Sequence, residues 1–215
     1  GSTLVLTQAE VGKAVTVEVS YTDSESTNEG PLASAATAVV GNIDDTATGT
    51  LNVTGSSQEG GTLTANLADV ADADGATTTA YQWQLNSGSG YSDIANASNA
   101  SLSIPADQSY VGADIRVIAT TTDALGGKTV FTGTGQSVAN VNDLPQGLPE
   151  ITGTATQGET LTADTSGISD ADGLGSFSYV WRAGGTAISG ATGSTLVLTQ
   201  AEVGKAVTVE VSYTD

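Results

Sequence analysis

Acidic side chains gather around two short Asn/Asp-rich segments of the sequence, residues 42–45 and 140–143. Near each segment, an Asp-x-Asp pair lies in a glycine-containing turn, and further carboxylates come from neighbouring turns. The first group consists of Glu10, Asp44, Asp45, Asp72, Asp74 and Asp123, and the second of Glu59, Asn142, Asp143, Asp170, Asp172 and Asp215. Both groups are candidate metal sites.

Electrostatic repulsion is the reason to expect an ion at these groups. Like charges within ~5 Å repel by a few kcal/mol per pair at an intermediate dielectric, so such a collection calls for a counter-ion. The chain has no His and no Cys, which leaves oxygen ligands and favours calcium over zinc or copper. The alternative is that these residues only form turns and keep an acidic surface soluble.

The composition excludes several classes of function. With 24 acidic and 5 basic residues the net charge is −19, which argues against nucleic acid and anionic membranes as partners. No apolar run approaches the roughly 18 residues needed to insert into a bilayer. Without Cys or His there is no thiolate nucleophile and no Ser-His-Asp triad, and the acidic pairs lack cleft-lining aromatic residues. We therefore predict that the chain is not an enzyme.

The elements that would position these groups are β-strands. Apolar and polar residues alternate with a period of two, as in Val15, Val17 and Val19, and helical periodicity is absent. Strands are predicted near 50–54, 61–67, 79–85, 100–104, 114–122 and 129–139, with turn residues between them. This spacing predicts an all-β chain of antiparallel β-sandwiches, with Trp83 in a core.

An internal repeat sets the domain boundaries. Residues 1–23 and 193–215 are identical, and the starts of the two copies lie 192 positions apart. Within this unit, the sequence Asp-Ala-Asp-Gly at 72–75 recurs at 170–173. We predict that 1–45 is the C-terminal half of one sandwich, 46–143 a complete sandwich, and 144–215 the N-terminal part of the next. A chain without Met is expected to be a window on a longer array.

The order Asp-Ala-Asp-Gly, an aromatic strand and an Asn-Asp-x-Pro boundary resembles cadherin repeats. More closely, each domain is similar to the cadherin-like and immunoglobulin-like repeats of giant bacterial surface adhesins, the RTX type included. The phrases that carry the resemblance are QGETLTA at 157–163, SDADGLG at 169–175 and GATGST at 190–195.

This resemblance implies tandem immunoglobulin-like or cadherin-like antiparallel β-sandwiches in a linear array, with calcium at the interdomain junctions. Carried over by motif, the ligands would be Asp72, Asp74, Asp170 and Asp172 from the loops and Asn142 and Asp143 from the second linker. The first linker, at 44–47, departs from the pattern because it lacks the Pro.

The predicted function is that of a structural extender segment in a long, secreted, repetitive bacterial surface adhesin, stiffened by calcium. It would project a distal binding domain or form a fibre outside the cell. Its expected partners are neighbouring copies of the same repeat, in cis or head to tail. One alternative is a carbohydrate- or cell-binding module that uses Tyr91 on the 86–100 loop. Another is a filament subunit that exchanges strands between incomplete terminal domains.

Overall fold

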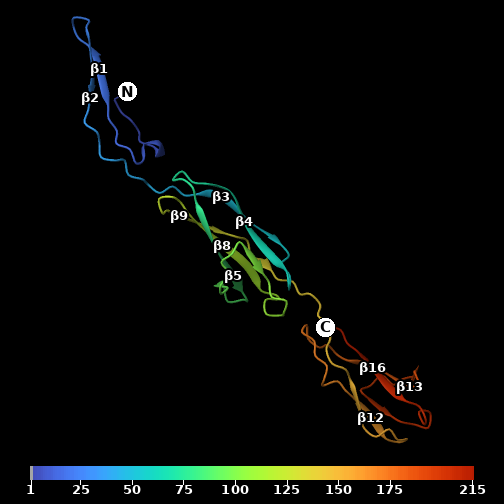
Figure 1. Ribbon diagram of the computed structural model, residues 1–215. Helices are drawn as coiled ribbons and strands as arrows, with labels where there is room; N and C mark the ends of the chain where they lie inside the picture. The colour runs from blue at the N-terminus through green and yellow to red at the C-terminus, as the bar shows by residue number, and fades with distance from the viewer. Residues whose placement is uncertain (1) are drawn as a thin grey trace. The chain divides into compact units, whose positions relative to one another are not determined.

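The computed structural model describes residues 2–215 and shows an all-β chain with several small antiparallel sheets (Figure 1). Within these residues there is no α-helix, and one short 3-10 helix, η1, spans Gln8–Glu10. No helix of the described chain is long and apolar enough to cross a bilayer. Contacts divide the chain into two compact units. One comprises residues 2–57, 61–104 and 113–137, and the other comprises 58–60, 105–112 and 138–215.

The first unit begins with a two-stranded ribbon of β1 (Glu18–Thr22) and β2 (Asn28–Ala33), which pair antiparallel. No residue between 2 and 45 is buried. Apolar side chains that alternate along this segment are therefore left in solvent: Val17 is 58% exposed and Val19 is 51% exposed.

Two sheets make up the rest of the first unit. The first has the order β3-β4-β7, formed by β3 (Thr48–Gly55), β4 (Thr62–Ala71) and β7 (Ser101–Ser103). The second has the order β10-β8-β5-β6, with β9 also paired to β8. Its strands are β5 (Thr78–Asn86), β6 (Ser92–Asp93), β8 (Asp114–Thr122), β9 (Lys128–Thr132) and β10 (Gln136–Ser137).

The core of this unit follows from the alternation in the sequence. Every second residue of β8 is buried, so its β-branched and apolar side chains point to one side of the sheet. Trp83 of β5 is fully buried, and its Nε1–H donates to the carbonyl of Asn99 at 2.9 Å. Gly133 lies between Val117 of β8 and Val53 of β3, where a Cβ would come within 3.0 and 3.3 Å of their side chains. The two sheets therefore approach closely there.

The second unit contains two three-stranded sheets. Strands β11 (Glu150–Thr152), β12 (Thr160–Asp164) and β15 (Thr195–Val197) form one. Strands β14 (Thr186–Ala187), β13 (Ser178–Ala183) and β16 (Val207–Ser212) form the other. Its core consists of Leu161, Ala163, Trp181, Leu196 and Leu198.

Each of the six predicted segments contains a strand, but β4 extends to Ala71, β6 was not predicted, and the alternating residues Val15 and Val17 lie outside β1. The segment 129–139 was expected to be continuous, but it is divided into β9 and β10. The break contains Gly133 and Gly135, which lie against the side chains of Val117 and Tyr91 without room for a Cβ. The chain bends there instead of extending one strand.

Candidate metal centre

Asp123 is the most constrained carboxylate of the first acidic group. It follows the end of β8 and is only 8% exposed. Its Oδ1 accepts the backbone N–H groups of Leu125, Gly126 and Gly127, at 2.6, 2.8 and 3.1 Å, and so fixes the turn into β9. Its Oδ2 is buried and accepts no hydrogen bond within residues 2–215.

A second buried carboxylate belongs to the loop between β4 and β5. The backbone N–H of Asp74 donates to Oδ1 of Asp72 at 2.9 Å, which orients the Asp-x-Asp turn. Oδ2 of Asp74 accepts the backbone N–H of Asp45 at 2.7 Å, and this bond holds the linker against the loop. Oδ1 of Asp74, a residue 6% exposed, is buried without a partner in the described chain.

Asp44 of the linker completes this cluster. One carboxylate oxygen each from Asp44, Asp74 and Asp123 lies within 4.8 Å of the others. Partial desolvation raises the pKa of the Asp44 carboxyl, and the negative charges of Asp123, Asp74 and Asp72 raise it further. The neighbouring carboxylates therefore repel one another when no cation lies between them.

These residues fit a metal ion. A buried polar atom normally has a hydrogen-bond partner, and an unpaired one calls for a ligand such as an ion or a water molecule. Here two unpaired carboxylate oxygens, on Asp74 and Asp123, lie beside a third carboxylate on Asp44. The donor set is entirely oxygen, which suits a hard divalent cation.

Gly127 is a residue of this site that the sequence analysis did not identify. A Cβ built on it would overlap a carboxylate oxygen of Asp44 and one of Asp123, and would lie 2.7 Å from Cγ of Asp44. The position must therefore be glycine for Asp44 to reach Asp123. The sequence signal is weak, because Gly126-Gly127 also reads as an ordinary turn.

Gly127→Ala is expected to weaken metal binding by roughly 10- to 100-fold, the usual effect of displacing a ligand's supporting contact. All carboxylates are retained, so the loss would come from the displacement of Asp44 and Asp123. Isothermal titration calorimetry with calcium measures it. Gly41→Ala is the matched control, because a Cβ there meets nothing within 4 Å. Unchanged affinity in Gly127→Ala would mean that the ion is not bound between Asp44 and Asp123.

The second acidic group forms a related cluster with more internal hydrogen bonds. Carboxylate oxygens of Asp170, Asp172 and Asp215 lie within 4.8 Å of one another. Asp172 Oδ2 accepts the N–H of Asp143 at 2.6 Å, and Asp170 Oδ1 accepts the N–H of Asp172 at 3.0 Å. Asp170 Oδ2 accepts the hydroxyl of Tyr213, and this bond, with burial and the nearby carboxylates, raises the pKa of Tyr213 to about 12.

Gln108 also belongs to this second site, and the sequence analysis did not identify it. Its Nε2 lies 2.6 Å from Oδ1 of Asp172, 2.8 Å from Oδ1 of Asn140 and 3.5 Å from Oε2 of Glu59. All four carboxylate oxygens of Asp170 and Asp172 therefore have donors. The sequence contains a pattern that could have identified it: Gln8, Gln108 and Gln200 each stand three residues before a Val-Gly pair.

The remaining candidates do not join either cluster. Glu10 accepts the N–H and hydroxyl of Thr7, at 2.9 and 2.8 Å, and caps the 3-10 helix η1. Glu59 is buried, and its Oε2 is within 3.4 Å of the N–H of Val141. Asn142 donates from Nδ2 to the carbonyl of Asp143 at 2.7 Å. Asp45 and Asp143 contribute backbone N–H groups rather than carboxylates.

Tyr91, the candidate for sugar stacking, packs within the protein. The guanidinium carbon of Arg116 lies 3.8 Å from the centre of its ring, so one face of the ring is covered. Arg116 is in turn held by Oε1 of Gln84, which accepts from its Nε at 2.8 Å. This arrangement leaves less of the ring for stacking on a sugar.

Comparison of the sequence with models of protein families and with curated proteins finds no match.

Proposed function

We propose that this chain is a structural extender segment of a long, secreted, repetitive bacterial surface adhesin. Its repeats would be immunoglobulin-like or cadherin-like β-sandwiches in tandem, joined by short acidic linkers. The all-β sheets and the identical stretches at 1–23 and 193–215 support this proposal. Neighbouring copies of the repeat would be its partners at the cell surface.

Calcium is the ion that we propose for the cluster of Asp44, Asp74 and Asp123. The observation that carries the proposal is the pair of buried, unpaired oxygens, Oδ1 of Asp74 and Oδ2 of Asp123. Asp44 belongs to the linker, whereas the other two come from loops at the end of one domain. An ion shared by all three would tie the linker to the domain and remove freedom of rotation about the linker.

The same bond between linker and loop occurs at both acidic groups. The N–H of Asp45 donates to Asp74 at 2.7 Å, and the N–H of Asp143 donates to Asp172 at 2.6 Å. In each case the donor is the second residue of an Asp/Asn-Asp pair and the acceptor is the second Asp of Asp-Ala-Asp-Gly. This recurrence supports a repeated junction that holds each linker against the domain that follows.

Calcium titration of the 215-residue chain tests the proposal. We expect binding by calorimetry and, at a calcium concentration 100 times the Kd, a stabilisation of about 2.7 kcal/mol. In a domain of about 100 residues each kcal/mol corresponds to a rise in Tm of about 4–8 °C. Small-angle scattering should show a larger maximum dimension with calcium than with EDTA.

Magnesium at the same concentration is the control, because it retains its waters and should stabilise less. If calcium changes neither the Tm nor the maximum dimension, the acidic groups only keep the chain soluble and the extender proposal loses its mechanism.

A further inference from the structure

One carboxylate oxygen distinguishes the two acidic groups. In the first group, Oδ2 of Asp74 accepts the N–H of Asp45, and Oδ1 of Asp74 is buried without a partner in the described chain. In the second group, Oδ2 of Asp172 accepts the N–H of Asp143, and Oδ1 of Asp172 accepts from Nε2 of Gln108 at 2.6 Å. Asp74 and Asp172 each stand 29 positions after the linker residue that donates to them. Gln108 therefore supplies at the second group the partner that the first group lacks.

The side-chain amide of Gln108 is surrounded by oxygen atoms, as a bound cation would be. Its Nε2 lies 2.6 Å from Oδ1 of Asp172, 2.8 Å from Oδ1 of Asn140 and 3.5 Å from Oε2 of Glu59. An amide nitrogen carries two hydrogens, which satisfy the two nearer oxygens. Oε2 of Glu59 also faces the N–H of Val141, at 3.4 Å. The amide of Gln108 thus occupies the position that an ion would need among these oxygens.

The second linker also brings one carboxylate fewer than the first. Asp44 of the first linker contributes a carboxylate oxygen to its cluster. The corresponding residue of the second linker is Asn142, because Asp45 and Asp143, the residues that follow, make the same bond to their loops. Asn142 is neutral, and its Nδ2 donates to the carbonyl of Asp143. The second group therefore has less repulsion for a cation to relieve.

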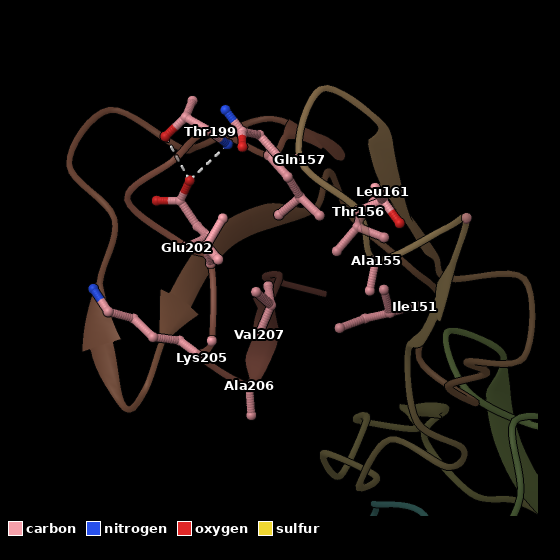
Figure 2. A pocket seen from close by; sticks show the side chains of 14 residues that line it. Ile151, Ala155, Thr156, Gln157, Leu161, Thr199, Glu202, Lys205, Ala206 and Val207 are labelled. Atoms are coloured by element: carbon pink, nitrogen blue, oxygen red, sulfur yellow. Dashed lines mark hydrogen bonds between the residues drawn. The ribbon is translucent and has the colours of Figure 1, made fainter.

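Hydrogen-bond donors can hold a carboxylate without an ion, and Glu202 in the same unit is an example. Its Oε2 accepts the hydroxyl and the N–H of Thr199, at 2.7 and 2.8 Å (Figure 2). Although Glu202 is only 9% exposed, these bonds hold the pKa of its carboxyl below the ordinary value. In both acidic groups three carboxylate oxygens lie within 4.8 Å of one another. The supply of donors, rather than this spacing, therefore separates the two groups.

We propose that Gln108 closes the second acidic group in place of a metal ion, so that the linker at 140–143 is held without calcium. With this amide in position, the residues of the second group do not fit an ion. Gln108 and Asp172 lie in segments 105–112 and 138–215, which belong to the same compact unit.

The two linkers would then differ in their response to calcium. The linker at 42–45 has no such donor at Asp74 and depends on the ion proposed for that cluster, so this contrast rests on the proposed function. Both linkers fall within one 192-residue unit of the sequence. Removal of calcium would therefore free one of the two linkers and leave the other held.

Calcium titration calorimetry and thermal melts of the 215-residue chain test this proposal. We expect the chain to bind one ion, which Asp123→Asn removes. Gln108→Glu keeps the shape of the side chain but replaces the donor with a carboxylate. It should bind an additional ion and lower the Tm in EDTA by about 5–10 °C. Gln108→Lys restores a donor and should behave as the wild type. Gln58→Glu is the matched control, because it adds the same charge at an exposed position of the same unit.

Three results would overturn the proposal. Two ions in the wild type, or one ion that persists in Asp123→Asn, would mean that the second group binds calcium with Gln108 in place. A Gln108→Glu variant that lacks either the additional ion or the loss of Tm would mean that the amide does not stand in for a cation. A wild type that binds no calcium would instead contradict the site at Asp74 and Asp123, and Gln108→Glu would still decide the role of Gln108.

Discussion

Asp123→Asn is expected to abolish the calcium-dependent gain in stability and to stabilise the calcium-free protein. The Asn side chain can keep the three backbone hydrogen bonds that Oδ1 of Asp123 accepts. It removes the buried oxygen that has no partner and offers an N–H to the neighbouring carboxylate of Asp44. Relief of an unsatisfied buried group should add about 1–3 kcal/mol without calcium. The gain of about 2.7 kcal/mol at 100 times the Kd should disappear.

Thermal melts in EDTA and in calcium measure both effects on one sample. Asp114→Asn is the matched control, because it removes the same charge from the opposite end of the same strand, β8. It should leave the calcium response intact. A variant at Asp123 that still gains stability with calcium would show that the ion binds elsewhere. If Asp123→Asn is instead destabilised in EDTA, the carboxylate of Asp123 has a partner in the calcium-free protein.

Trp83→Ala is expected to lower the free energy of unfolding of the first unit by about 3–5 kcal/mol. Trp83 is fully buried and is among the largest side chains of that core. Its replacement leaves a cavity and also removes the donor for the carbonyl of Asn99. Trp83→Phe should cost less, since it keeps most of the apolar volume and loses mainly the hydrogen bond.

The remaining tryptophan provides the internal control for this measurement. In Trp83→Ala, the fluorescence of Trp181 reports only on the core formed by Leu161, Ala163, Leu196 and Leu198. Urea unfolding followed by circular dichroism should then show an early transition that Trp181 fluorescence does not follow. Coincident transitions at the wild-type midpoint would mean that Trp83 contributes little to its core.

Local patterns in the sequence predicted most of the strands between residues 46 and 143, because burial on one side of a sheet imposes a period of two. β8 is the clearest case: its alternation predicted 114–122, and the structure has the same bounds. The division of 129–139 into β9 and β10 depends on how Gly133 meets Val117 across the sheet. That contact joins residues far apart in the chain. In the sequence it is indicated only by the two glycines, Gly133 and Gly135.

Local sequence patterns also predicted part of the acidic site. Asp-Ala-Asp-Gly and the Asp44-Asp45 linker are local signals, and the structure brings Asp44, Asp74 and Asp123 together. Glu10 was included because the corner that contains it was expected to face the same junction, yet its carboxylate caps η1 through Thr7. A capping box has its own signature, Thr followed three residues later by Glu, which explains the residue without a metal.

Burial was the property least readable from sequence. Residues 1–23 and 193–215 are identical, yet Leu6 is 50% exposed and Leu198 is 6% exposed. The difference comes from the segments packed against the two copies. Alternation marks which side of a strand is apolar, and the rest of the chain decides whether that side is covered.

The identical stretch also bears on how such a protein changes length over generations. Recombination between the DNA segments that encode 1–23 and 193–215 would delete or insert one 192-residue unit. Because β15 and β16 both lie within the second copy, every crossover point inside it leaves their sequences whole. Length variants would therefore arise in whole 192-residue units, each with the sequences of all its strands intact.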